Sequence, residues 1–409
     1  MVIPDPRRAL ARRVYYGWVV AVACFLASVV VFGSSYAFGV FYDAFIDSFG
    51  APRSWLAFVF GLQTALLYVV GIGAGRLIDR HGQRRVSAVS SVILVAGLVW
   101  TAFARSYVEL LLAFGVVSAT GMAGLYIVGY ATLPAWFERR RGLATGFAAA
   151  GLGAGLVVVP PGADAAIAAF GWRRAMLVVA GFAVVLLAVV VVLLADTPEE
   201  VGADSSVEFG DGETDEDEGK IDVRAVVSSA PFLLVLVGWL LVFTPMYVVF
   251  SHVVLHASDA GVGRSTGVLA IAVIGVTTTA ARIGIGGLSD RLGRTRTFVT
   301  GAIVLGSATV GIAVAPTATA LLVIAAAFGA GYGACGGLLG AITADLFGNR
   351  SLNTLFAILS LAFAISGLFA PPLAGLWFEI ADSYRPAFVA AGLLGIAGSG
   401  CVALGSARA

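Results

Sequence analysis

Apolar residues run in long stretches along this 409-residue chain, and short polar or charged segments separate them. A membrane-spanning helix needs about 20 mainly apolar residues. Twelve stretches meet that requirement, at residues 16–41, 55–78, 86–104, 107–131, 142–168, 173–195, 230–254, 266–289, 297–315, 317–344, 352–378 and 385–405. The pattern therefore predicts an all-α integral membrane protein with twelve transmembrane helices.

The second half of the chain repeats the first at a constant spacing of 211 residues. The segment from Gly75 to Arg85 returns from Gly286 to Arg296, and Pro160-Pro161 returns as Pro371-Pro372. The segment Arg174–Gly181 likewise returns as Arg385–Gly392. Two homologous halves in an apolar chain are typical of a secondary transporter, whose substrate site lies between the halves.

Composition agrees with a membrane protein. Only 12% of the residues are charged, whereas a soluble domain carries about 25%. The formal net charge of +1 gives no reason to expect nucleic acid as a partner, and the bilayer is the expected environment. Cys24, Cys335 and Cys401 all fall in apolar stretches, so we interpret them as small packing residues rather than as disulfide partners.

Basic residues indicate the orientation. Eighteen of them fall in segments on one side of the predicted spans and six on the other, which places both termini in the cytoplasm by the positive-inside rule. The apolar run after Arg12 and Arg13 is too long for a cleavable signal. We expect a multi-pass cell-membrane protein with cytoplasmic segments at 1–15 and 406–409.

One long polar stretch, residues 196–229, divides the spans into an N-terminal six (16–195) and a C-terminal six (230–405). It contains the acidic run Thr214–Glu218. We interpret it as a flexible, solvated cytoplasmic linker, with a regulatory or partner-binding segment as the alternative.

The repeated segment forms a charged loop after the second helix of each half. Its glycines allow close helix approach, and its acidic residue can cap a helix or pair with arginine. We therefore expect a gate at these loops; the alternative is that they only set topology. The expected gating residues are Asp79, Arg80, Arg84, Asp290, Arg291 and Arg294.

These two loops resemble the signature loop of the major facilitator superfamily. The resemblance implies two pseudo-symmetric six-helix bundles and transport by alternating access. Further segments look like the branch of monocarboxylate porters and oxalate/formate antiporters. They are Tyr16–Trp18, Ser35–Phe41, Trp136–Gly146, Tyr247–His252 and Ala281-Arg282.

One charged residue lies well inside a predicted span. Arg282 precedes Asp290 by eight residues, which places it about 12 Å deeper along the helix. Because a charge in the bilayer centre is costly, such a residue usually has a function. Its guanidinium can hold a carboxylate with two parallel hydrogen bonds, whereas the alternative is a structural arginine bonded to backbone carbonyls. The resemblance favours substrate binding.

Polar and aromatic residues in other spans are candidates to line the same site. Each can also be a packing or interfacial residue. In the resembled antiporters, aromatic residues of helices 1, 4 and 10 line the anion site, which favours Tyr36, Tyr126 and Tyr332. The remaining candidates are Tyr247, His252 and Gln63.

The chain also departs from the resembled transporters. Gly39-Val40 stands where monocarboxylate porters have a lysine, and Thr278 stands where they have an aspartate. Phe363 stands where the oxalate antiporters have a second cation. A single arginine matches one negative charge, so we expect a small monocarboxylate, moved by exchange or uniport. Any coupled proton would be carried by the substrate or by His252.

Other functions are less compatible with the sequence. An exporter of drugs or sugars would favour acidic residues within the N-terminal spans, and none is found in mid-helix. A membrane sensor without transport would need an output domain, for which only the linker is available. No nucleophile constellation, metal-ligand cluster or phosphate-binding loop indicates an enzyme, a metal or a cofactor. We expect a monomer.

Overall fold

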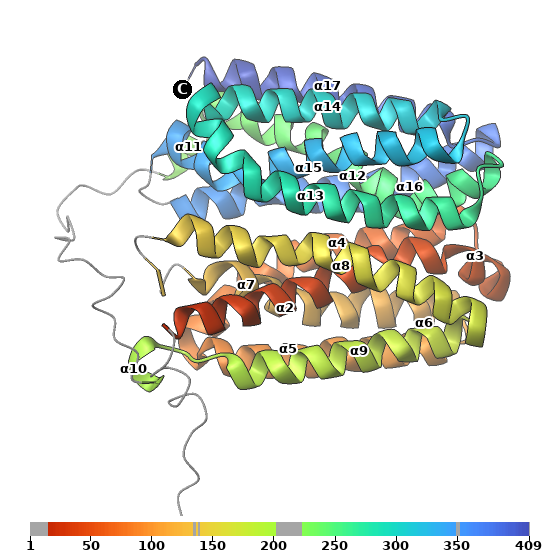
Figure 1. Cartoon of the computed structure of the whole chain (residues 1–409), viewed down its shortest axis with the longest axis horizontal. Helices are drawn as coiled ribbons and strands as arrows, with labels where there is room; N and C mark the ends of the chain where they lie inside the picture. The colour runs from red at the N-terminus through yellow and green to blue at the C-terminus, as the bar shows by residue number, and fades with distance from the viewer. Residues whose placement is uncertain (1–14, 134–135, 138–139, 202–222, 349–351, 409) are drawn as a thin grey trace, which may run out of the picture.

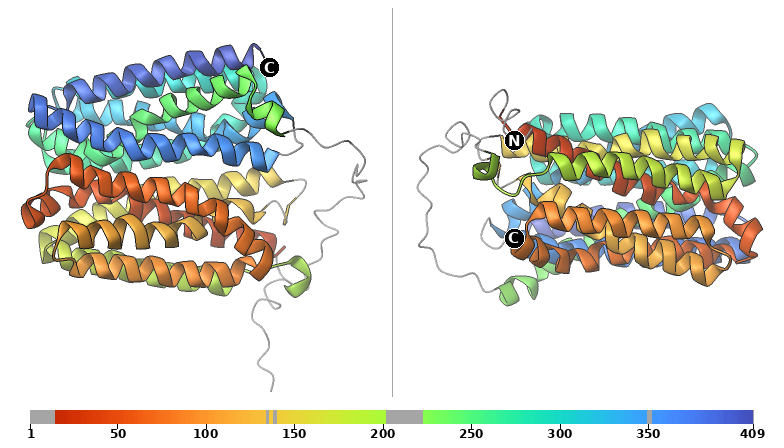
Figure 2. Two further views of the ribbon diagram at one scale, coloured as in Figure 1. Left: turned by 180° about the vertical axis from the view of Figure 1, so that it is seen from behind. Right: turned by 90° about the horizontal axis from the view of Figure 1, so that it is seen from below.

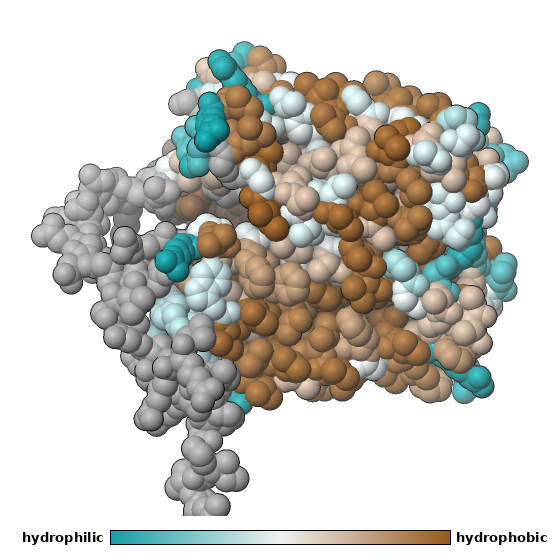
Figure 3. All heavy atoms as spheres, in the orientation of Figure 1, coloured by the Kyte–Doolittle hydropathy of each residue, from teal (hydrophilic) through white to brown (hydrophobic). Residues whose placement is uncertain are grey.

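The computed structural model describes residues 15–133, 136–137, 140–201, 223–348 and 352–408. Within these ranges, twelve helical segments are long and apolar enough to cross a membrane, which confirms the predicted all-α membrane fold. Large apolar side chains cover the flanks of the molecule, and polar residues gather toward both ends (Figure 3).

The N-terminal half holds six spans. The first consists of α2 and α3 in line, and the fourth of α6, η1 and α7, with η1 a π-helix. The elements are α2 (Gly17–Tyr36), α3 (Phe38–Phe49), α4 (Arg53–His81), α5 (Gln83–Phe103), α6 (Tyr107–Leu110), η1 (Leu111–Ser118), α7 (Ala119–Ala131), α8 (Arg141–Phe170) and α9 (Trp172–Leu193).

The C-terminal half holds the other six spans, one helix each. They are α12 (Ala230–Asp259), α13 (Arg264–Leu292), α14 (Arg294–Val314), α15 (Ala318–Phe347), α16 (Leu352–Ala381) and α17 (Arg385–Ser406). Between the halves lie two short helices, α10 (Pro198–Val201) and α11 (Val223–Val227). The acidic run of the predicted linker lies outside the described residues.

The first span is longer than the sequence predicted. The approximate end predicted at residue 41 falls eight residues before the observed end of the helix at Phe49. The helix continues to Phe49 because α3 buries Phe41 and Phe45, while Asp43 forms an ion pair with Arg264.

The repeated loops are tight turns that need glycine. Gly82 ends α4 with φ 82°, and Gly293 ends α13 with φ 89°. A positive φ of this kind is costly for residues with a side chain. The last glycine of each repeated segment is therefore explained by the backbone of the turn.

The two halves lie one above the other as layers of helices (Figure 1), and the reverse view shows the same arrangement (Figure 2). The helix pairs with the most extensive contacts between the halves are α4 with α16, α8 with α13, and α3 with α12. We call the end with α10, α11 and the Gly82 and Gly293 turns the linker end. The opposite end, with the turns at Gly50 and Gly261, is the distal end.

Candidate functional site

Arg282 lies on α13 at the interface between the halves and is partly buried. Its Nη1 donates a hydrogen bond of 3.2 Å to the carbonyl oxygen of Ala149, on α8 of the other half. Its Cζ lies 5.5 Å from the ring centroid of Tyr332 on α15. The one charge that the sequence places deep in a span thus stands where both halves can reach a common ligand.

Four tyrosines from both halves are close enough to interact through their hydroxyl groups near this arginine. Tyr36 and Tyr332 are within hydrogen-bonding reach of each other, and Tyr36 also lies within electrostatic range of Arg282. The Tyr247 hydroxyl meets the Tyr68 hydroxyl at 3.5 Å. We call Tyr36, Tyr68, Tyr247 and Tyr332 the tyrosine cluster. It brings hydrogen-bonding groups to an otherwise apolar centre.

Further aromatic rings pack around the tyrosine cluster. Tyr126 packs edge-to-face on Tyr68, with ring centroids 5.4 Å apart. The ring of Phe363 also packs on Tyr68, with centroids 5.3 Å apart. Phe363, the residue found in place of a second cation, is buried against these rings and adds no charge to them.

Gln63 is close in sequence to the cluster but is already bonded. Its Oε1 accepts a hydrogen bond of 2.8 Å from the Ser35 hydroxyl, and its Nε2 lies 3.2 Å from Met122 Sδ. All three residues belong to the N-terminal half. The contacts of Gln63 therefore tie helices of one half together.

His252 lies away from Arg282, toward the distal end. It is fully buried, and its Nε2 is 2.9 Å from the carbonyl oxygen of Pro371. Its ring packs on Tyr42 and Tyr384, with centroids 5.5 and 4.8 Å away. The structure thus groups His252 with residues of the distal end and not with the tyrosine cluster.

Ion pairs join the two halves at the distal end. Arg53, the first residue of α4, pairs with Asp259 at the end of α12 with an N–O distance of 2.6 Å. Its Cζ also lies 3.8 Å from the centroid of the Phe378 ring. The backbone N–H of Ser54 donates to Glu379 Oε1 at 2.8 Å. The start of α4 is thus held by the ends of α12 and α16.

A second cluster holds the start of α13. The guanidinium of Arg264 pairs with Asp43 on α3 and with Asp164 on α8, the latter at 3.0 Å. It also donates a hydrogen bond of 2.6 Å to the carbonyl oxygen of Val40. We call these contacts of Arg53 and Arg264 the distal clamp.

Aromatic packing closes the interface between the distal clamp and the tyrosine cluster. The ring of Tyr36 stacks on Phe250, with centroids 4.2 Å apart. Gly39 lies so close to α12 that a Cβ there would stand 2.5 Å from the carbonyl oxygen of Phe250. The backbones of α3 and α12 are therefore in direct contact.

At the linker end, two described loop arginines bind residues of their own half or of the start of the linker. The Arg84 backbone N–H donates to Asp196 at 2.9 Å, and the Arg84 Nε donates to the Val191 carbonyl at 3.0 Å. Arg294 pairs with Asp345 at 2.6 Å and, more weakly, with Asp290 at 3.7 Å. The side chains of Asp79, Arg80 and Arg291 are exposed.

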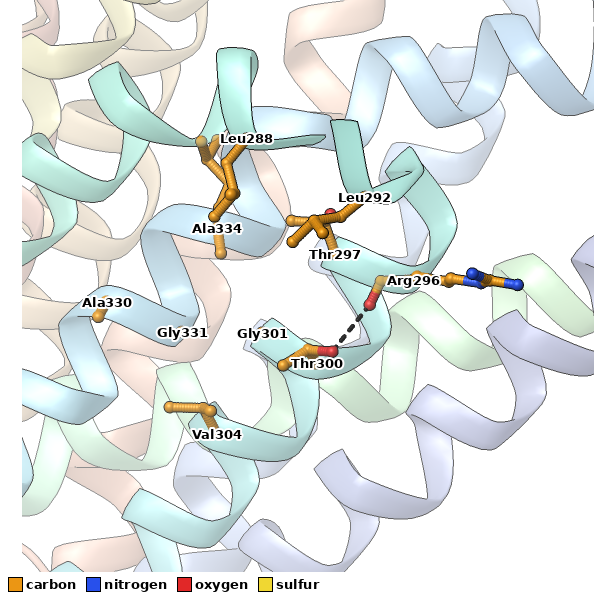
Figure 4. Close-up of a pocket in the computed structure, with 11 residues that line it drawn as sticks. Leu288, Leu292, Arg296, Thr297, Thr300, Gly301, Val304, Ala330, Gly331 and Ala334 are labelled. Carbon is orange, nitrogen blue, oxygen red and sulfur yellow. Dashed lines mark hydrogen bonds between the residues drawn. The ribbon is translucent and has the colours of Figure 1, made fainter. Parts of the chain in front are cut away.

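A groove of about 420 Å³ opens between α13, α14 and α15, and no residue of the tyrosine cluster lines it. Its lining includes Leu288 and Leu292 of α13, Gly301 and Val304 of α14, and Gly331 of α15 (Figure 4). The Arg296 side chain points away from it. Within the described ranges, no group of three or more His, Cys, Asp or Glu residues could hold a metal ion.

Sequence reasoning missed several residues that the structure brings to these sites. Tyr68 was not among the candidates, although it is a polar residue inside a span, like the tyrosines that were chosen. Arg53 and Arg264 were counted only as charges on one side of the membrane, although they are separated by the repeat spacing of 211 residues.

The fold and the interface define a multi-pass membrane protein with its candidate site between two pseudo-symmetric bundles. The sequence matches the model of the Major Facilitator Superfamily over residues 24–291 and 268–406. The chain therefore belongs to the major facilitator superfamily, and it is a transporter rather than an enzyme.

The similar proteins include monocarboxylate transporters. Monocarboxylate transporter 13 of Bos taurus is 26% identical over 396 residues, which cover 94% of this chain and 88% of that protein. Monocarboxylate transporter 3 of Rattus norvegicus is 28% identical over 382 residues, covering 92% and 77%. Together with the family match, they show a monocarboxylate-transporter-like protein.

A solved structure has the same fold. It is a bacterial homolog of the human lysosomal transporter Spinster in an inward-facing and unoccupied conformation. Its TM-score is 0.70 at 17% identity, and the match covers 96% of each chain. At this identity the similarity establishes the fold alone.

Proposed function

We propose that this transporter moves a small monocarboxylate across the cell membrane by alternating access, and that Arg282 binds the carboxylate. The observation that carries the proposal is the position of Arg282, a guanidinium between the halves and beside the tyrosine cluster. A bidentate arginine–carboxylate pair is strong and directional, and the low dielectric of a membrane interior strengthens it.

The residues that line the site indicate how many negative charges the substrate carries. Phe363 occupies the place of a second cation, and it packs among Tyr68, Trp239 and Phe243. One guanidinium neutralises one carboxylate. A dianion would bring an uncompensated charge into an aromatic environment, which is costly. The site is therefore suited to a monoanion with an apolar or hydroxyl-bearing body.

The contacts between the halves support a state that is closed at the distal end. The distal clamp and the Tyr36–Phe250 stack all cross the interface there. Among the described residues at the linker end, Arg294 forms its ion pairs within its own half, and added side chains at Gly73, Gly75, Gly146 or Gly284 would meet nothing within 4 Å. With the linker end in the cytoplasm, this state is open to the inside.

Gating is thereby shared between two sets of residues. The distal clamp closes the outer side in this state. The loop residues Asp79, Arg80, Arg84, Asp290, Arg291 and Arg294 close the inner side in the opposite state. Because His252 is packed among residues of the distal end, a proton coupled through it would act on the clamp and not on the carboxylate.

The test is uptake into proteoliposomes of labelled acetate, L-lactate, pyruvate and benzoate, with and without unlabelled anion inside and with and without a pH gradient. We expect uptake of at least one anion, lost in Arg282→Ala and strongly reduced in Arg282→Lys, because lysine cannot form the two parallel hydrogen bonds. Undiminished uptake by both variants would overturn the assignment of Arg282.

A further inference from the structure

Gly336 on α15 leaves the space in which the Arg282 guanidinium lies. A Cβ at this position would stand 2.6 Å from Nη2 and 3.3 Å from Cζ of Arg282. The 2.6 Å approach is closer than real Cβ atoms make, so the guanidinium, the far end of a flexible side chain, would have to move. Tyr332, one helical turn earlier on α15, lies beside the same guanidinium. Arg282 can keep its position because residue 336 has no side chain.

That position gives Arg282 its bond to the other half. With the guanidinium lying over Gly336, Nη1 reaches the Ala149 carbonyl on α8. The repeat spacing relates Arg282 to Gly71 on α4. Gly71 faces Ile127 of its own half. Only one of the two pseudo-equivalent interfaces thus has this charged contact at its centre.

We propose that Gly336 is a positioning residue. It positions the Arg282 guanidinium so that its hydrogen bond to Ala149 holds α13 on α8 in the empty protein. When substrate binds, its carboxylate replaces the Ala149 carbonyl as the hydrogen-bond partner of the guanidinium. The second part rests on the proposed function, because it needs Arg282 to bind the carboxylate. Substrate binding thereby loosens one contact that keeps the halves in this state.

The exchange of partners is favourable on chemical grounds. A hydrogen bond from a guanidinium to a carboxylate is stronger than one to a neutral carbonyl, and the carboxylate can accept two in parallel. The Ala149 carbonyl lies inside α8, where it accepts the helical hydrogen bond of Gly153. It therefore keeps a partner when the arginine leaves.

The experiment measures how far the halves part at the distal end. Spin labels at Asp47→Cys on α3 and Ala318→Cys on α15, in a Cys401→Ala background, report this distance by pulsed electron paramagnetic resonance in lipid nanodiscs. Both labelled positions are exposed, one in each half, and the remaining cysteines, Cys24 and Cys335, are buried. The measurement on the empty protein needs no substrate.

We expect Gly336→Ala to raise the ratio of long to short distances in the empty protein, on the order of tenfold for the loss of one charged hydrogen bond. Arg282→Gln should give a similar shift without adding a side chain. The matched control is Gly340→Ala, one turn further along α15, where a Cβ would meet nothing within 4 Å. It should leave the ratio unchanged.

The double variant separates positioning from a general packing effect. Gly336→Ala should add nothing in the Arg282→Gln background, because the bond is already lost. Additive shifts, or an unchanged ratio in Gly336→Ala and Arg282→Gln, would overturn the proposal. If Gly336→Ala does not fold, Arg282→Gln alone decides whether the bond holds the halves.

Adding sodium acetate, L-lactate, pyruvate or benzoate completes the test. At least one anion should shift the unmodified protein toward long distances and have a smaller effect on Gly336→Ala. If an anion is transported with Arg282 required but leaves the distances unchanged, the substrate step of this proposal fails while the proposed function stands. If no anion is transported, the proposed function fails, and the empty-protein result still judges the role of Gly336.

Discussion

At the scale of single residues, hydroxyl groups and the Arg282 guanidinium supply the polar chemistry of the candidate site, apart from the ion pairs of the distal clamp. The tyrosine cluster draws its members from α2, α4, α12 and α15, so each half contributes two. Tyr68 and Tyr247 connect the halves through their hydroxyls. A substrate that binds here is therefore contacted by both bundles at once.

Tyr68→Phe should weaken substrate binding and keep the fold. The change removes one neutral hydroxyl hydrogen bond, worth about 0.5–1.5 kcal/mol, so we expect the KM for uptake to rise about two- to tenfold. Proteoliposome uptake measures this directly. The control is Tyr107→Phe, whose hydroxyl donates to the Trp55 carbonyl near the distal surface. Equal effects of both changes would argue against a role of Tyr68 at the site.

Sequence reasoning singled out Arg282 as a site candidate but not the residues that surround it. A charge inside an apolar stretch is visible in a linear pattern, because its cost does not depend on the partner. The contacts of Gly336 and Ala149 with Arg282 depend on how α13, α15 and α8 pack, and many glycines of this chain look alike in sequence. His252 shows the same limit, since its distance along α12 did not reveal which neighbours enclose it.

At the scale of elements, the helices of the interface approach through glycines. On α4, a Cβ at Gly61 would stand 2.8 Å from the Leu368 carbonyl of α16, in the other half. On the same helix, a Cβ at Gly73 would meet nothing within 4 Å. The distal part of α4 is thus tightly packed on its partner and the linker part is not.

Gly61→Ala should disfavour the distal-closed state. Overpacking against backbone costs about 1–3 kcal/mol, which should move the distances between labels at residues 47 and 318 toward the open form. Gly73→Ala serves as the control on the same helix and should not produce this shift. A shift of the same size and direction in both variants would show that the interface does not determine it.

The two arginines of the distal clamp should contribute unequally to the stability of the closed distal end. Arg53 has one acidic partner among its ion pairs, whereas Arg264 has two. All these side chains are partly exposed, so a single pair contributes only about 0–1 kcal/mol. We expect Arg264→Gln to open the distal end more than Arg53→Gln in the distance measurement, and added salt to reduce the difference. The reverse order would show that the stacking of Arg53 on Phe378 outweighs the charges.

The helices were largely predictable, while their contacts were not. Apolar length determines a span, so twelve segments could be located from hydropathy, with errors where charged residues such as Asp43 occur inside a helix. The distal clamp joins residues far apart in the chain, as in the Arg53–Asp259 pair, and no local pattern reveals such pairs. The sequence feature that pointed to the distal clamp was the repeat, because it relates Arg53 to Arg264.

At the scale of the whole molecule, the repeat spacing of 211 residues also organises the interface. It relates Arg53 to Arg264, and both begin the second helix of their half and bind acidic residues of the opposite half. It also relates Gly39 to Phe250, which touch each other across the interface. The distal end is therefore closed by a nearly two-fold symmetric set of contacts.

The same symmetry relates two close helix contacts in which the glycine lies on opposite partner helices. A Cβ at Gly367 would stand 2.3 Å from Thr64, and one at Gly275 would stand 2.8 Å from Leu156. The spacing relates Thr64 to Gly275 and Leu156 to Gly367, so these are equivalent contacts with the small residue on opposite partners. Close approach is kept at both interfaces although the sequences differ. Arg282 is an exception to this symmetry, which fits a role in substrate recognition rather than in scaffolding.

Holding the two halves together at the distal end should stop transport. In a Cys401→Ala background, Arg53→Cys with Asp259→Cys places one thiol on each half, where the native pair is 2.6 Å apart. A short bifunctional methanethiosulfonate should link the thiols and abolish carboxylate uptake in proteoliposomes, because alternating access requires these ends to separate. Reduction should restore uptake. The matched control is Ser48→Cys with Trp172→Cys, whose side chains are hydrogen-bonded at 2.8 Å within the N-terminal half at the distal end, and their cross-link should leave most uptake intact. Full activity of the cross-linked Arg53–Asp259 variant would contradict movement of the halves at the distal end.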